Sequence, residues 1–346
     1  MFETGVEQDG NNMSTVSLRK HGTGFLLKYG DVKLALDTGI KGETTLLSHS
    51  HSDHIGGLKN AKHIIATKGT FDTWQARKAY SFNSRTVIKH GDMFGQIGVN
   101  ITALNAGHVL GSTMFLLEFD DGLRVLYTGD FNNVDSLVHK AAQPVEADVL
   151  VTEATYGAPQ WVFPERPSVY ENILEAATSI MDQGRIPLFQ AYSLGKSQEA
   201  IALLQSGGFR VISGNTSIDR VCTVYKQHGV DLRHHIIESD GLNDILSEGA
   251  VIVSSSSRHT IENLRRGLEK ELFERYAPKL ERFTLSGWTM GKFRERGFPL
   301  SAHSDFNGLL TFAKKVNPRV AYCFTENGRI LSKHLSDNGI HAVPLE

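Results

Sequence analysis

The chain has 346 residues, enough to bury a full hydrophobic core and to form two domains or one large domain with an insertion. Its formal net charge of −2 provides no overall positive field, so a nucleic-acid ligand would need a local basic surface or a metal centre. Two cysteines, Cys222 and Cys323, are too few for a disulfide framework.

Residues 1–13 are polar and rich in glycine and asparagine. We expect them to form a flexible tail, because they have neither the apolar segment of a signal peptide nor that of an anchor. No run of about 18 apolar residues follows, so we expect no membrane-spanning helix. Together these features favour a cytoplasmic location.

Short apolar runs separated by turn residues dominate the first half of the sequence and predict β-strands. We expect strands at 24–29, 32–37, 44–48, 97–104, 113–119, 123–128 and 149–153, and a helix at 70–80. Most histidines and aspartates of this half follow the ends of these strands. Ligands and catalytic groups converge at strand ends in many sheet-based enzymes, so this region is the candidate site.

From about residue 167 the pattern changes to alternating helices and strands, which predicts a parallel α/β unit. We expect helices at 169–181, 196–205, 218–229 and 260–276, and strands at 185–190, 210–213 and 250–254. The end of the chain predicts a helix at 305–316, a strand at 319–324, a helix ending near 338 and a closing strand.

The segment from His49 to His54 has the pattern His-x-His-x-Asp-His. In an extended segment, side chains two residues apart point the same way, so His49 and His51 can share one metal ion. Asp53 and His54 then face a neighbouring position. Imidazole and carboxylate groups are the ligands that catalytic zinc favours, with one coordination position left for water.

Three further residues complete the predicted site. His108 and Asp130 each follow a predicted strand and have a glycine beside them, which permits the tight turns that direct a ligand inward. Asp130 is the expected bridging carboxylate. Asp37 follows another strand and could accept the ring N–H of a ligand histidine. A lone histidine is usually an ordinary core or surface residue, but six such groups in this pattern indicate a metal site.

At these residues the chain resembles the metallo-β-lactamase superfamily, whose signature is an early Asp, His-x-His-x-Asp-His, a lone His and a lone Asp. A narrower resemblance is to the β-CASP nucleases, the group that includes RNase J, Artemis and the cleavage-and-polyadenylation nuclease. It rests on the amino-acid sequences of residues 108–112, 127–131, 153–157, 191–199 and 301–305.

The resemblance implies an α/β fold, a metallo-β-lactamase αββα sandwich with an inserted parallel α/β β-CASP domain. The expected division is a tail at 1–13, the first part of the sandwich at 14–165, the insertion at 166–295 and the return of the sandwich at 296–346.

The resemblance also implies catalytic roles. Asp53 would serve the metal site, and His303, paired with Glu153, would donate a proton to the leaving oxygen. A carboxylate partner raises the pKa of an imidazole and fixes its tautomer, which suits a general acid. Two zinc ions, or manganese in their place, would activate water for attack on phosphorus.

A third β-CASP motif places a histidine ligand near position 325 in RNA-processing members, and this chain has Thr325 followed by Glu326. We therefore expect weaker occupancy of the second metal site unless Glu326 substitutes. Artemis-like members that act on DNA also lack this histidine, which favours DNA slightly.

We predict a zinc-dependent nuclease, acting as an exonuclease on single-stranded nucleic acid. RNA-processing endonuclease or 5′-exonuclease activity is an alternative. A hydrolase of small esters or thioesters is a second alternative, and a non-catalytic nucleic-acid-binding protein is a third. A homodimer is possible. Basic candidates for contacting the substrate backbone are Lys196, Arg258, Lys292, Arg294 and Arg296.

Overall fold

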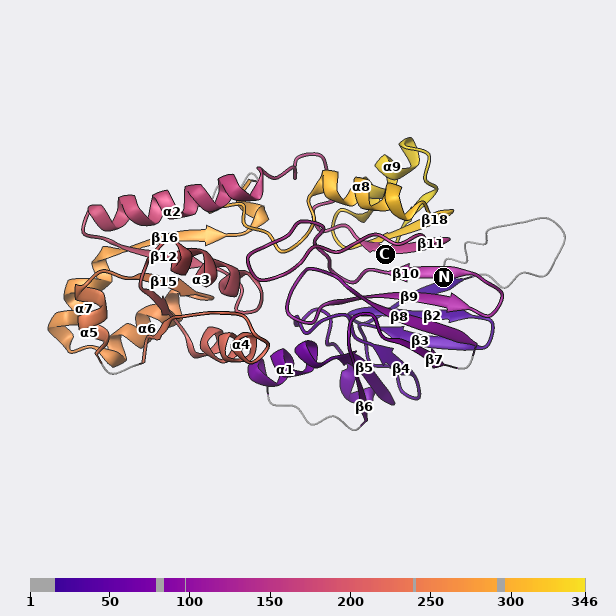
Figure 1. The fold of residues 1–346 in the computed structure, drawn as a ribbon, viewed down its shortest axis with the longest axis horizontal. Coiled ribbons are helices and arrows are strands. Elements are labelled where there is room, and N and C mark those ends of the chain that lie inside the picture. The colour runs from indigo at the N-terminus through magenta and orange to yellow at the C-terminus, as the bar shows by residue number, and fades with distance from the viewer. Residues whose placement is uncertain (1–15, 79–83, 97, 239–240, 291–295, 346) are drawn as a thin grey trace. The chain divides into compact units, whose positions relative to one another are not determined.

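The computed structural model describes residues 16–78, 84–96, 98–238, 241–290 and 296–345 (Figure 1). The predicted tail at 1–13 lies outside these ranges. The chain divides into two compact units. Unit 1 contains Met1–Val134, Lys140–Pro159 and His303–Glu346, and unit 2 contains Asp135–His139 and Gln160–Ala302.

Unit 1 contains two mixed sheets. The first has the order β1-β2-β3-β4-β5-β6, formed by Ser17–His21, Gly24–Tyr29, Val32–Leu36, Thr44–Leu46, His63–Thr67 and Arg85–Ile88. The second has the order β19-β18-β11-β10-β9-β8-β7, formed by Ala342–Pro344, Val320–Phe324, Val149–Glu153, Arg124–Tyr127, Thr113–Phe119, Val99–Asn105 and Met93–Gln96.

The two sheets pack face to face, since one hydrophobic core includes Phe25 and Leu36 of the first sheet with Phe115 and Val151 of the second. The outer face of the first sheet packs against α1 (Lys68–Arg77) through Phe71 and its neighbours. The second sheet is covered by α8 (Phe306–Val316) and α9 (Gly328–Asp337). These layers form an αββα sandwich, which confirms the predicted fold class.

Unit 2 has a parallel sheet of order β14-β13-β15-β12-β16-β17. The strands are His235–Ile236, Val211–Ser213, Val251–Ser254, Ile186–Gln190, Leu280–Leu285 and Gly297–Phe298. On one face lie α5 (Leu242–Ser247), α6 (Ser257–Gly267) and α7 (Lys270–Tyr276), which share a core with β12, β13 and β15. The helices α2 (Arg166–Asp182), α3 (Lys196–Ser206) and α4 (Thr216–Gln227) also pack on this sheet.

The expected helix at 260–276 is wrong in one respect, because the chain forms two helices there. Gly267 ends α6, and Leu268 takes an extended backbone with φ −122° and ψ 147°. Glycine destabilises a helix interior, which favours the break at this point. Across the described part of the chain, every helix is too short or too polar to traverse a bilayer.

Candidate metal centre

Two glycines of unit 1 allow close approach between loops that carry the predicted ligands and other parts of the backbone. Gly129 has φ +54°, and a Cβ there would lie 2.5 Å from Cβ of Ser48. Gly107 has φ +68°, and a Cβ there would lie 2.5 Å from the carbonyl oxygen of Asn132. Only glycine combines a positive φ with such a close approach without strain. Gly107 directly precedes His108, and Gly129 directly precedes Asp130.

Asp37 is the buried centre of a hydrogen-bond network beneath the loop. Its Oδ1 accepts the Ser48 backbone N–H at 2.6 Å, and its Oδ2 accepts the Ser48 hydroxyl at 2.6 Å and the Tyr127 hydroxyl at 2.7 Å. Oδ2 also lies 2.8 Å from Nδ1 of His54. Asp37 has φ +52°, which is uncommon outside glycine and is consistent with a backbone held by these contacts.

Four side chains direct donor atoms into one small volume. The ligand atoms of His49, His51, His108 and Asp130 all lie within 4.8 Å of one another. Nδ1 of His51 lies 3.0 Å from Nε2 of His49 and 3.0 Å from Nε2 of His108. Oδ2 of Asp130 lies 3.6 Å from Nε2 of His49 and 3.8 Å from Nε2 of His108.

These separations fit a bound metal ion. Ligand atoms about 2.1 Å from a tetrahedral zinc ion are about 3.4 Å apart, close to the spacing of these four donors. The set of three imidazoles and one carboxylate is also chemically suited to zinc and related divalent metals.

His54 lies beside this cluster and contacts both Asp130 and Asp37. Nε2 of His54 lies 3.3 Å from Oδ2 of Asp130, while its Nδ1 faces Asp37. Asp53, also predicted as a ligand, is exposed and belongs to none of the three groups among the described residues whose geometry could hold a metal ion. Burial lowers the pKa of Arg77, and the nearby carboxylate of Asp53 acts in the opposite direction. A role for Asp53 at the metals stays a prediction.

Burial and neighbouring charges shift the pKa values of these groups. Burial, together with the neighbouring histidines, lowers the pKa of His49 well below its ordinary value, which keeps its lone pair available to a metal. Burial alone would raise the pKa of Asp130, but His54 and His303 outweigh it and hold that pKa well below its usual range. Burial likewise opposes protonation of His54, yet Asp130 and Asp37 raise its pKa well above the ordinary value.

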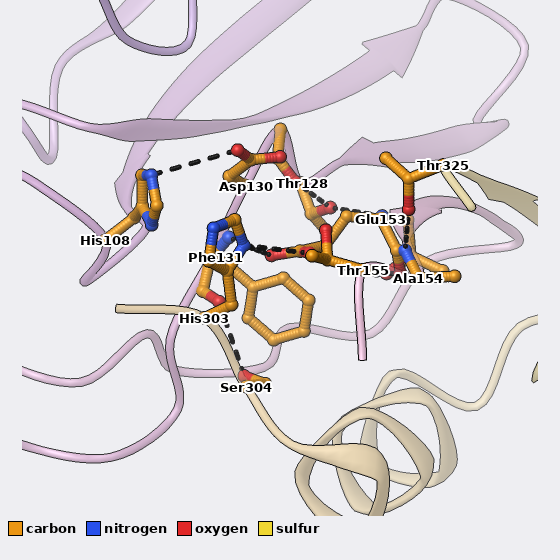
Figure 2. A network of polar contacts seen from close by, with 12 residues as sticks. His108, Thr128, Asp130, Phe131, Glu153, Ala154, Thr155, His303, Ser304 and Thr325 are labelled. Carbon is orange, nitrogen blue, oxygen red and sulfur yellow. Dashed lines mark hydrogen bonds and ion pairs between the residues drawn. The ribbon is translucent and has the colours of Figure 1, made fainter. Parts of the chain in front are cut away.

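His303 and Glu153 meet beside this cluster, as Figure 2 shows. Nδ1 of His303 lies 3.0 Å from both carboxylate oxygens of Glu153. Glu153 is fully buried and accepts the N–H groups of Phe131 at 2.9 Å and Thr155 at 3.3 Å. The His303 ring centroid lies 4.5 Å from that of His108. Nδ1 is therefore engaged by Glu153, which fixes the orientation of the imidazole ring.

Glu153, His303 and Asp130 could themselves hold an ion, because their ligand atoms also lie within 4.8 Å of one another. Ser304 fixes this part of the chain, since its backbone N–H donates to the Phe131 carbonyl at 2.9 Å.

Thr325 lies where the third β-CASP motif would have a histidine, and its side chain makes a hydrogen bond to the backbone. It has φ +74°, and its hydroxyl accepts the Ala154 N–H at 2.9 Å (Figure 2). Thr325 and Glu326 are both exposed and belong to no metal-binding cluster within the described ranges. Substitution of the missing histidine by Glu326 stays a prediction.

The predicted substrate contacts lie in unit 2 and differ in their surroundings. Lys196 is buried, with its ammonium 4.4 Å from the centre of the Tyr192 ring. Arg258 is exposed and pairs with Glu262. Arg296 pairs with the buried Glu281 and lies over the ring of Phe283. Lys292 and Arg294 lie outside the described residues.

The sequence pattern did not reveal two contributors to the site. Tyr127 resembles a core aromatic at the end of an apolar strand, and Ser48 is the polar last residue of a predicted strand, yet both donate to Asp37. The one available signal was their position next to the motifs, Ser48 directly before His49 and Tyr127 three residues before Asp130.

Comparison with known proteins identifies the type of domain. Residues 28–188 match the family described as a beta-lactamase superfamily domain. A protein of Opitutus terrae named as a probable DNA ligase is 27% identical over 320 residues, which cover 89% of this chain and 29% of that protein. An RNase J-like protein of Methanocaldococcus jannaschii is 28% identical over 229 residues, covering 59% of this chain and 54% of that protein.

The chain thus spans about half or less of the length of these two relatives. A crystal structure of an Enterococcus faecalis protein of unknown function has a TM-score of 0.54 to this chain at 12% identity, covering 88% of this chain and 79% of the other. At that identity the likeness concerns the fold alone, and it supports the predicted fold class.

Proposed function

Because this chain belongs to the metallo-β-lactamase superfamily and its relatives include an RNase J-like protein, we propose that it is a metal-dependent phosphodiesterase that cleaves single-stranded nucleic acid. The observation that carries this proposal is the convergence of His49, His51, His108 and Asp130, with the His303–Glu153 pair beside them. A binding module would not require a paired proton donor next to such a cluster.

We assign zinc to this cluster on the basis of its donor set, with manganese as a substitute. A divalent metal held there supplies a Lewis acid for phosphoryl oxygens and lowers the pKa of water. A second ion is expected beside His54 and Asp130, where Asp53 completes the predicted ligand set.

The residues of the chain account for orientation and proton transfer. Ser48 Oγ lies 3.0 Å from Nδ1 of His49, which fixes the ring so that Nε2 faces the cluster. Asp37 does the same for His54. Glu153 engages Nδ1 of His303, so that Nε2 can deliver a proton to the departing oxygen.

DNA is our preferred substrate, and exonucleolytic cleavage our preferred mode. The support is the relative in Opitutus terrae, whose name refers to DNA ligation and which matches 89% of this chain. The RNase J-like relative favours RNA instead, so RNA cleavage is the second candidate. Unit 2 would be the β-CASP domain, with the predicted bounds 166–295.

End-labelled single-stranded DNA and RNA of one sequence test this proposal directly. We expect zinc-loaded protein to shorten the DNA strand faster than the RNA strand, and removal of the metals by a chelator to abolish both reactions. Re-addition of zinc or manganese should restore them, because the proposed chemistry depends on the metals.

Preferential RNA cleavage would replace DNA with RNA as the substrate. Hydrolysis of a thioester or ester without cleavage of either nucleic acid would contradict the proposed function and support a small-molecule hydrolase. Full activity after verified metal removal would contradict metal dependence.

A further inference from the structure

The loop between β12 and α3 is held rigidly by buried polar side chains from the first turn of that helix. Ser197 donates its hydroxyl to the Tyr192 carbonyl at 2.7 Å. Gln198 accepts the Gly195 N–H at 2.7 Å and donates to the Ser193 carbonyl at 3.1 Å. Both side chains are fully buried. These buried hydrogen bonds therefore stabilise the loop conformation.

Lys196 is the exception among these buried groups. Its side chain is only 4% exposed, yet within the described ranges its ammonium donates no hydrogen bond and forms no ion pair. The nearby carboxylate of Glu199 is already engaged by Arg166 and by the Tyr170 hydroxyl, the latter at 2.5 Å. A largely buried lysine with no hydrogen-bonded carboxylate among the described residues carries a desolvation cost, and an anion bound at its ammonium would offset that cost.

The aromatic ring beside this ammonium faces solvent. Tyr192 is 64% exposed, although large aromatic side chains usually bury most of their surface. Its ring centre lies 4.4 Å from the Lys196 ammonium. An exposed aromatic ring next to a cation can bind a nucleotide. The base stacks on the ring, and the phosphate contacts the cation.

The position of the loop in the sheet of unit 2 supports a binding role. The adjacent parallel strands β12 and β15 are followed by connections that run to opposite sides: β12 leads through α3 to β13, and β15 leads through α6 and α7 to β16. Ligands of open α/β sheets bind at such a switch point, outside the carboxyl ends of the strands. Tyr192 and Lys196 follow the carboxyl end of β12.

We propose that Tyr192 and Lys196 form a nucleotide subsite for the single-stranded substrate, in which the Tyr192 ring stacks on a base and the Lys196 ammonium contacts the adjoining phosphate. The inference rests on the proposed function and deepens it. The subsite lies in unit 2 and contains no metal ligand, so it binds nucleic acid whether or not metal is present.

One expected consequence is that the charged Lys196 lowers the stability of the free protein. Burial lowers its pKa to about 8, with Glu199 acting in the opposite direction. Since the folded pKa lies below the unfolded value, wild-type stability should rise as the pH increases from about 8 to about 10.5. We expect Lys196→Met to melt several degrees above wild type at pH 7, with a gap that narrows by pH 10. An equal or lower melting temperature of the variant at pH 7 would contradict the cost of burial on which the proposal depends.

The test is equilibrium binding of a fluorescent single-stranded DNA oligonucleotide in the presence of a chelator, followed by anisotropy over a range of salt concentrations. We expect Tyr192→Ala to weaken binding by about tenfold through loss of stacking, while Tyr192→Phe binds like wild type. Lys196→Met should also weaken binding and lower the slope of log affinity against log salt by about 0.7, because one phosphate contact is lost. Lys196→Arg should retain the slope.

Lys226→Met is the matched control, because Lys226 is an exposed lysine in the last turn of α4. Unchanged affinity of Tyr192→Ala and an unchanged salt slope of Lys196→Met, in proteins that bind metal and melt cooperatively, would overturn the subsite. If Lys196→Met does not fold, the cost of burial is contradicted, and the comparison of Tyr192→Ala with Tyr192→Phe decides whether the ring stacks on a base. Failure of wild type to bind any oligonucleotide would instead contradict the proposed function.

Discussion

Asp130→Asn should lower the rate of nucleic-acid cleavage by roughly 10³-fold, a loss on the scale of removing a main charge-stabilising group. Oδ2 of Asp130 lies 3.3 Å from Nε2 of His54 and 3.6 Å from Nε2 of His49, so this carboxylate is within reach of both proposed metal positions. Asparagine keeps the shape of the side chain and removes its negative charge. The measurements are single-turnover cleavage of labelled DNA and metal content by mass spectrometry.

Asp120→Asn is the matched control, because Asp120 is an exposed aspartate of the β9–β10 turn in the same unit. This control should keep both metal and activity. The metal content of Asp130→Asn should fall together with its rate, since asparagine is a weaker ligand than a carboxylate. An Asp130→Asn protein with full metal content and undiminished cleavage would remove Asp130 from the site.

Strands bounded by clear turn residues could be predicted from the sequence alone. The structure has the strands at 24–29, 113–119 and 149–153 with the predicted bounds. Each is a run of mainly apolar residues, and all are buried except Lys28 and Tyr29 at the end of the first strand and Glu118 in the second. The strands His63–Thr67 and Leu280–Leu285 were missed, the second because its polar residues interrupt the apolar run. Their pairing with β4 and β12 depends on the sheet, which local sequence does not specify.

In the candidate site, too, some contacts follow from local sequence and others depend on the fold. The spacing of His49 and His51 places them together by local geometry, and the structure brings His108 and Asp130 to them from separate loops. The network around Asp37 joins residues 11 and 90 positions away, Ser48 and Tyr127, and no local pattern predicts such contacts. The burial of Lys196 beside the Tyr192 ring is also a property of the folded chain, since sequence shows a lysine but not its surroundings.

His303→Asn should slow cleavage of DNA by about 10²–10⁴-fold and slow hydrolysis of a p-nitrophenyl ester of thymidine 5′-phosphate by less than about tenfold. A sugar alkoxide needs a proton as it departs, whereas p-nitrophenolate leaves without one near neutral pH. Glu153→Gln should show the same pattern with a smaller loss, because Glu153 acts through His303 by holding its Nδ1 at 3.0 Å. The measurement is the ratio of the two rates for each protein.

The exposed His341 provides the control His341→Asn, which should leave both rates unchanged. Equal losses on the two substrates would contradict the role of proton donor. Metal content separates this role from the alternative that the geometry also permits, in which Asp130, Glu153 and His303 hold an ion. A His303→Asn protein that retains its metal but loses only DNA cleavage fits a proton donor, because the metals remain able to activate water while the leaving oxygen goes unprotonated.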